Sequence, residues 1–150
     1  MKGQLRAGYL LMEYLVVLAL VSVIGLGIAW QGEKSWTAFR LHLATQQVVG
    51  MIHQAQSISR GSAGTDVGIF RVHGRKRQCE VWQGLKLVKR QVLPEGISFA
   101  SPNNYEMTFQ EYGRVVRLPG STYQIVLENR HGLRKRIIIS AQTGRVRIAS

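Results

Sequence analysis

Residues 9–30 form the most apolar stretch of the chain, and they contain a single charged side chain, that of Glu13. As a helix they would extend about 33 Å, which matches the roughly 30 Å hydrocarbon core of a lipid bilayer. A carboxylate in lipid costs about 2.5–3.5 kcal/mol on insertion scales. The sequence therefore predicts a membrane-spanning helix, and the free-energy cost of its one acidic residue indicates that this residue has a function.

The residues around this span allow more than one interpretation. Lys2 and Arg6 precede it, so the positive-inside tendency predicts a cytoplasmic N-terminus, with the rest of the chain outside the membrane. The span could be a plain anchor, or a cleaved secretory signal, because residues 27–29 offer a small-x-small cleavage site. An apolar region of this length with an acid inside it fits a conventional signal poorly, and a plain anchor has no use for the acid.

A third interpretation rests on the order of residues in "MKGQLRAGYLLMEYLVVLAL". A short basic segment ends at Gly8, the aromatic Tyr9 follows, and Glu13 is the fifth residue after Gly8. This order resembles the class III signal of type IV prepilins and pseudopilins, although Tyr9 stands where that family usually has Phe, and Leu10 where Thr is common. The resemblance implies that prepilin peptidase removes residues 1–8 as a leader and methylates the new N-terminus at Tyr9.

The resemblance also implies a role for Glu13. Cleavage after Gly8 would create an α-amine at Tyr9 that is charged at neutral pH. In a filament of this family, the amine of an incoming subunit faces the glutamate of its neighbour, so two charges in an apolar environment compensate each other. Ionisable residues inside membrane segments are functional by default. We therefore expect Glu13 to act in assembly; the alternative is a carboxylate that reaches the headgroups or is protonated.

Residues 31–60 are predicted to continue the helix. Apolar side chains recur there at three- or four-residue steps and form one stripe; they are Leu41, Ala44, Val48, Met51, Ala55 and Ile58. Short strand patterns separated by turn residues follow in residues 61–150. The predicted fold class is α+β and pilin-like: a long N-terminal α-helix, membrane-embedded in its first half, packs on a C-terminal antiparallel β-sheet domain. The terminal "GRVRI" resembles the GspH and FimT pseudopilins and is most similar to the ComGD minor pilins of competence pili.

The charge of the chain is strongly positive. Its 20 Lys and Arg against 8 Asp and Glu give a formal net charge of +12, which indicates a polyanionic partner such as nucleic acid or an anionic membrane. Strand alternation near the C-terminus predicts four arginines on one face, with Ile137, Ile139, Val146 and Ile148 turned to the core. The four are Arg134, Arg136, Arg145 and Arg147. They are candidates for contact with a polyanion such as DNA; a solvated basic face, which Ile138 would share, is the alternative.

Enzymatic chemistry has little support in the sequence. The four histidines form no HExxH pair, no phosphate-binding loop is present, and Cys79, expected to be a half-buried strand residue, has no nucleophile motif around it. We expect no cofactor and no metal. The sequence predicts a minor pilin of a competence type IV pilus, involved in pilus assembly and DNA uptake, with other pilins, prepilin peptidase, the membrane and DNA as partners. The alternatives are a minor pseudopilin of a type II secretion system and, from another class, a membrane-anchored or secreted polyanion-binding module.

Overall fold

The computed structural model describes residues 3–61, 67–101, 103–116 and 122–149, and for residues 3–10, 27–31 and 111 it describes the backbone alone. The chain forms two compact units, Met1–Trp36 and Thr37–Ser150. The elements of the described residues are α1 (Gly3–Gly61), β1 (Gly68–His73), β2 (Gln78–Gln83), β3 (Lys86–Val92), β4 (Ile97–Phe99), β5 (Asn104–Phe109), the short 3₁₀ helix η1 (Glu111–Gly113), β6 (Thr122–Asn129), β7 (Arg134–Ser140) and β8 (Val146–Ala149).

Helix α1 is continuous over 59 residues. It passes through Gly32 and Gly50, where an added side chain would meet nothing, so neither glycine interrupts the helix. It ends at Gly61, one residue beyond the predicted helical segment. Over the described residues, no helix contains a segment long and apolar enough to cross a membrane.

The strands form two four-stranded antiparallel sheets, in the orders β3-β2-β1-β5 and β4-β6-β7-β8. Most neighbours are joined by short turns, as the sequence predicts, but β5 pairs with β1 while β4 joins the second sheet. The segment "RVVRL" at residues 114–118 is one of the short strand patterns expected from the sequence, but its described part forms no strand, and Val115 makes only an isolated bridge to Phe109. The 3₁₀ turn η1 redirects the chain just before it, and residues 117–118 lie outside the described residues.

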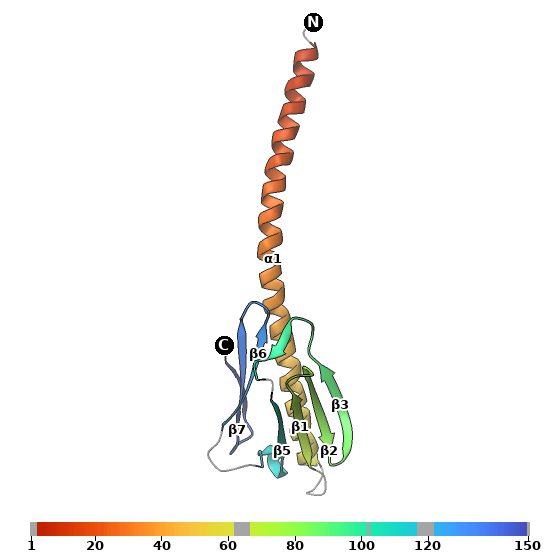
Figure 1. Cartoon of the computed structure of the whole chain (residues 1–150), viewed down its shortest axis with the longest axis vertical. Helices are drawn as coiled ribbons and strands as arrows, with labels where there is room; N and C mark the ends of the chain where they lie inside the picture. The colour runs from red at the N-terminus through yellow and green to blue at the C-terminus, as the bar shows by residue number, and fades with distance from the viewer. Residues whose placement is uncertain (1–2, 62–66, 102, 117–121, 150) are drawn as a thin grey trace. The chain divides into compact units, whose positions relative to one another are not determined.

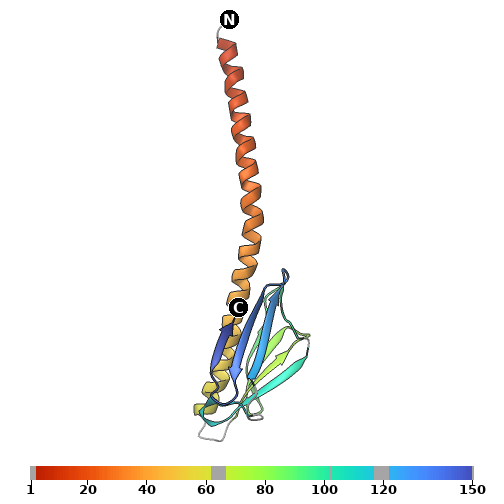
Figure 2. The same cartoon turned by 90° about the vertical axis from the view of Figure 1, so that its left-hand side faces the viewer.

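The core of the second unit lies between the C-terminal part of α1 and the inner faces of both sheets. Figures 1 and 2 show this part of α1, coloured orange to yellow, running alongside the strands. Five of the six predicted stripe residues are buried, and Ile58 is half-buried against the core. The two sheets contribute alternate residues, with Phe70 and Val72 on β1 and Ile137 and Ile139 on β7 among those fully buried. The predicted α+β class, with a long N-terminal helix packed on antiparallel sheets, is confirmed.

Buried polar side chains fix the last turns of α1 to the strands. Ser59 Oγ donates to the carbonyl oxygen of Phe109 at 2.8 Å and accepts from the backbone N–H of Gly68 at 3.1 Å. Gln56 Nε2 donates to the carbonyl oxygen of Gly144 at 2.6 Å. At Gly68 a Cβ would collide with the backbone carbonyl of Ala55. Only glycine therefore allows β1 to begin so close to the helix.

Candidate functional site

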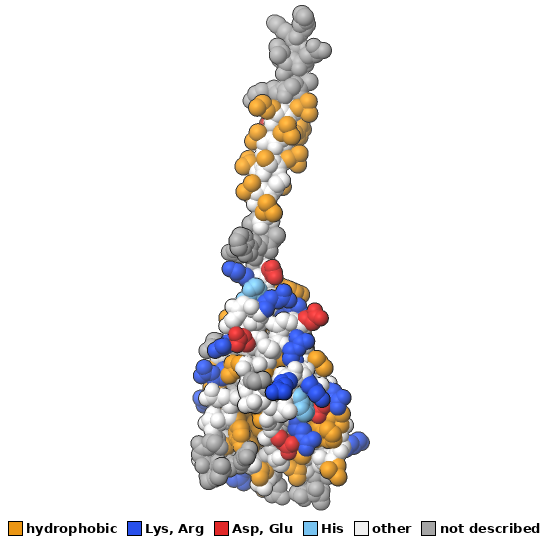
Figure 3. Space-filling model, viewed as in Figure 1, with side chains coloured by type: hydrophobic (Ala, Val, Ile, Leu, Met, Phe, Trp, Pro, Cys, Tyr) orange, Lys and Arg blue, Asp and Glu red, His pale blue; other side chains and the backbone are white. Residues whose placement is uncertain are grey.

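The predicted processing segment belongs to α1. Gly8 and Tyr9 lie in its helical backbone, and the structure describes only the backbone of these two residues. From Leu11 to Leu26 every side chain is exposed, and the large apolar ones are 50 to 74% exposed. Figure 3 shows this segment covered with apolar side chains. A continuous apolar surface of this kind is unusual for a monomeric soluble protein and marks a surface that associates with protein or lipid.

Glu13 is the acidic residue of this exposed apolar segment, and its side chain is exposed. It follows Tyr9 by four residues of continuous helical backbone. Glu13 therefore places one carboxylate on an otherwise apolar and exposed stretch of α1, residues 11–26.

The four arginines share one face of the second sheet. Arg134 and Arg136 lie on β7, Arg147 on β8 is the register partner of Ile138, and Arg145 immediately precedes β8. All four side chains are exposed, while Ile137 and Ile139 between them are buried. The predicted alternation is therefore present on β7, whereas on β8 Val146 is half-buried and both Arg147 and Ile148 are exposed. Ile138 is half-buried on the arginine side, as expected from the pattern.

Two features of this arginine face differ from the sequence expectation. Ile148, predicted to face the core, is 37% exposed, because β8 lies at the edge of its sheet and pairs on one side only with β7. Arg134 Nε donates to Glu128 Oε2 on β6 at 2.9 Å. The strand pairing of β6 with β7 brings Glu128 opposite Arg134. This acid compensates part of the positive charge, and it lies on a strand outside the last hairpin.

A second polar cluster, which the sequence analysis missed, lies on the outer face of the first sheet. Glu80 on β2 has a side chain only 5% exposed. Its carboxylate accepts hydrogen bonds from Trp82 Nε1 at 2.9 Å and Arg90 Nε at 2.8 Å, and His73 Nε2 lies 3.5 Å away. Burial acts to raise the pKa of Glu80, but the hydrogen bonds from Trp82 and Arg90 outweigh it and hold that pKa below its ordinary value. The cluster fixes three strands and is a structural network.

Replacing Glu80 with glutamine is expected to destabilise the protein by about 1–3 kcal/mol, because charge-assisted hydrogen bonds are lost in a nearly buried position. The matched control is Glu106→Gln, which removes an ion pair with Arg71 whose two side chains are more than a third exposed; it should cost at most about 1 kcal/mol. Urea unfolding of both variants in detergent measures the difference. Equal effects would contradict the role of the Glu80 network.

The lowered pKa also predicts the pH dependence of this effect. Glu80 binds its proton less readily in the folded than in the unfolded protein, so its contribution is complete above the ordinary carboxyl pKa of 4.5. It is lost as the pH falls through the lower, folded-state pKa. The stability difference between the parent protein and Glu80→Gln should therefore shrink in acid below that range.

Metal and thiol chemistry have no geometric support in the part of the chain that the structure describes. Within it, no group of three or more His, Cys, Asp or Glu side chains could hold a metal ion. Cys79 on β2 is fully buried rather than half-buried as expected, with its Sγ 3.4 Å from Met51 Sδ. Burial raises the pKa of its thiol to about 12, so the thiolate needed for nucleophilic chemistry is not formed at neutral pH.

Comparisons with known proteins support the fold. No protein-family model matches the sequence, and no curated protein sequence matches it. A solved structure that is similar is that of the type IV minor pilin FimU of Pseudomonas aeruginosa, with a TM-score of 0.52 and 13% sequence identity, over 79% of this chain and 91% of that chain. The likeness shows that this chain shares the α+β fold of that pilin, which confirms the predicted pilin-like fold class.

Proposed function

We propose that this chain is a minor pilin of a competence type IV pilus that acts in pilus assembly and DNA uptake during transformation. One observation carries the proposal: a single helix, α1, joins the Gly8–Tyr9–Glu13 motif and an exposed apolar segment to the core of a domain with a pilin-like fold. The motif suits processing, the exposed segment suits packing among other subunits, and the domain supplies an outward-facing surface.

In this proposal the processing site, the apolar span and Glu13 act one after another. Prepilin peptidase cuts after Gly8 and methylates the amine of Tyr9, while residues 9–30 hold the subunit in the membrane with its N-terminus on the cytoplasmic side. During assembly the span moves into the filament core, where Glu13 pairs with the amine of a neighbouring pilin. The charge pair replaces two separately unfavourable charges. The domain then lies outside the cell on the pilus surface.

A minor pseudopilin of a type II secretion system would have the same fold and the same processing motif. The arginine face and the formal net charge of +12 favour a role in DNA uptake, because such a surface attracts nucleic acid without requiring sequence recognition. A membrane-anchored or secreted polyanion-binding module is the candidate of another class. It would share the arginine face but would have no need of Glu13.

Deletion of the gene is expected to abolish DNA uptake, and the parent gene should restore it. A gene with all four arginines of the arginine face changed to alanine should restore pilus assembly but not DNA uptake. Loss of protein secretion with intact DNA uptake in the deletion strain would favour the secretion pseudopilin instead.

The same four-arginine variant gives a test in vitro, because each lost phosphate contact should flatten the log–log salt dependence of duplex DNA binding by about 0.9.

The control for charge alone removes four basic residues from other exposed positions: Arg75, Lys76, Lys86 and Lys89. This control variant should keep the salt dependence of the parent protein and its DNA uptake. If the two variants behave alike, DNA contact is not located on the arginine face. If the parent protein binds no DNA at low salt, the DNA role fails while the pilin assignment stands.

A further inference from the structure

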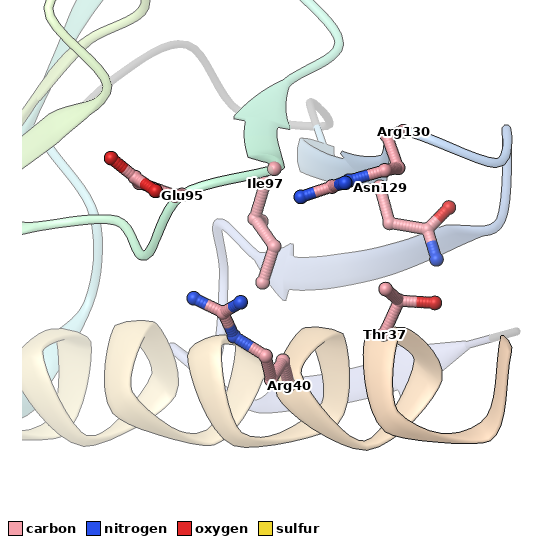
Figure 4. Close-up of a pocket in the computed structure, with 7 residues that line it drawn as sticks. Thr37, Arg40, Glu95, Ile97, Asn129 and Arg130 are labelled. Atoms are coloured by element: carbon pink, nitrogen blue, oxygen red, sulfur yellow. The ribbon is translucent and has the colours of Figure 1, made fainter. Parts of the chain in front are cut away.

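Four described strands lie at the edges of the two sheets, and β3 presents the longest edge. It has seven residues, whereas β4 has three and β8 has four. Buried Ile97 on β4 points toward α1, where Arg40 lies beside it (Figure 4). The outer edge of β5 is partly covered, since the backbone N–H of Val116 donates to the carbonyl oxygen of Thr108 at 2.8 Å. Among the described strands, β3 is therefore the edge most open to a further strand.

Strand β3 has accessible side chains on both of its faces. On β2, Cys79 and Val81 point into the core and are fully buried. The β3 residues that pair with them are not: Gln91 is half-buried and Lys89 is exposed. β3 therefore extends past the edge of the core, and Figure 1 shows it at the outer margin of the first sheet. An edge strand of this kind offers alternate backbone N–H and C=O groups to an incoming strand.

A β-bulge places two lysines of β3 on one face of the sheet. The register with β2 shifts at Val88, which has no partner residue of its own on β2. Lys89 pairs with Val81, and Lys86 pairs with the β2 residue two positions further on. Because residues two positions apart on a strand share a face, Lys86 and Lys89 lie on the same side although three positions separate them.

The other face of β3 carries apolar side chains. Leu87 and Val92 are 36% and 53% exposed. Arg90 lies between them, and its Nε donates to Glu80 Oε1 at 2.8 Å. Exposed apolar side chains on a strand can pack against those of a neighbouring strand. The edge thus combines unengaged apolar surface on one face with two cations on the other.

The charge around this edge selects the kind of strand that fits it. Residues 74–92 contain six Lys and Arg and a single acid, Glu80, which Trp82 and Arg90 already bond. A second copy is a poor occupant, because β3 paired antiparallel with itself about its middle residue brings Lys89 opposite Lys89, and like charges directly opposite are destabilising. A nucleic acid would meet the cations but would leave the edge amides and the apolar face unused. An acidic protein strand satisfies all three.

We propose that β3 accepts, as a fifth strand of the first sheet, an extended segment of another protein in which acidic and apolar side chains alternate. The acidic side chains lie beside Lys86 and Lys89, and the apolar ones pack on Leu87 and Val92. Backbone hydrogen bonds along β3 supply the affinity, and the alternation supplies the specificity. The inference concerns the β-sheet domain alone and holds whether or not the chain is a pilin.

The test uses the full chain in detergent and a synthetic peptide of alternating glutamate and valine with the length of β3. The peptide should slow amide hydrogen exchange in β3 and leave exchange in β8 unchanged. Lys86→Gln with Lys89→Gln should weaken peptide binding by up to about fivefold for each lysine. The matched control is Arg75→Gln with Lys76→Gln, which removes the same charge from exposed positions of the β1–β2 turn and should bind as the parent does at physiological salt.

Modified peptides separate strand pairing from simple charge attraction. In an extended peptide, the backbone N–H groups of the glutamates point to one edge and those of the valines to the other. N-methylation of one set should abolish binding, whereas N-methylation of the other set should leave it intact. A peptide of the same composition with its glutamates grouped at one end has the same charge but no alternation, and it should bind more weakly.

Several results would overturn strand addition at β3. They are unchanged exchange in β3 with the alternating peptide, equal binding of the two N-methylated peptides, and binding of the grouped peptide as tight as that of the alternating one. Protection of β3 by duplex DNA but not by the peptide would assign this edge to nucleic acid and equally overturn the proposal. None of these results bears on leader processing or on Glu13, through which the proposed function is tested.

Discussion

Replacing Glu13 with alanine is expected to block assembly of the subunit into filaments while leaving its processing intact. In the proposed filament, the variant would leave the amine of a neighbouring Tyr9 without a partner in an apolar environment. Removing one member of a buried ion pair costs about 3–5 kcal/mol, which corresponds to a loss of roughly a hundredfold or more in the assembly equilibrium. The measurement is the fraction of the subunit recovered in sheared filaments, together with DNA uptake by the same cells.

Two further substitutions sharpen this prediction. Glu13→Asp keeps the charge but has a shorter reach, so it should give intermediate assembly. Glu33→Ala removes another acidic residue of α1, three residues beyond the proposed span, and should assemble normally. Normal filaments with Glu13→Ala would rule out the pairing role, because the apolar segment would then carry an acid for no reason connected with assembly.

Changing Gly8 to valine is expected to abolish cleavage of the leader. The family resemblance places Gly8 immediately before the scissile bond, and a branched side chain restricts the backbone there in a way that glycine does not. The uncut chain would keep Lys2 and Arg6 and would have no α-amine at Tyr9, so both membrane extraction and charge pairing during assembly would fail. The mass of the subunit isolated from membranes shows whether the leader is present.

The control for this variant is Ala7→Val, which adds the same side chain one residue earlier and should be processed. If Gly8→Val is cut as efficiently as the parent chain, the bond after Gly8 is not the processing site. If both variants remain uncut, cleavage requires small residues at both positions 7 and 8. The comparison then places the processing site only at residues 7–8.

Local patterns predicted much of the fold. The apolar stripe from Leu41 to Ile58 identified the packed side of α1 because helical periodicity is a property of neighbouring residues. Period-two alternation likewise identified the buried Ile137 and Ile139. Pairing between distant segments was not predictable in this way. The ladder between β1 and β5 joins residues more than thirty positions apart, and nothing within either strand specifies the other as its partner.

The candidate sites also differ in whether they depend on local sequence or on pairing between distant segments. Gly8, Tyr9 and Glu13 could be proposed from sequence because their meaning lies in a fixed spacing along the chain. The ion pair of Arg134 with Glu128 and the network around Glu80 depend on which strands become neighbours. The hydrogen bonds of the turn between β6 and β7 were also not predictable. Asn129 Oδ1 accepts two of them from the backbone N–H groups of His131 and Leu133, but the sequence does not distinguish this asparagine from other polar residues in turns.

The N-terminal sequence of the mature protein, isolated from its own cells, tests most directly whether the chain is processed as a pilin. We predict that it begins Tyr-Leu-Leu-Met-Glu, from Tyr9, with a methylated α-amine. A protein that begins at Trp30 would mean release by signal peptidase and loss of Glu13 with the signal, and one that still begins at Met1 would mean that no leader is removed. Either result would contradict the assignment as a processed pilin.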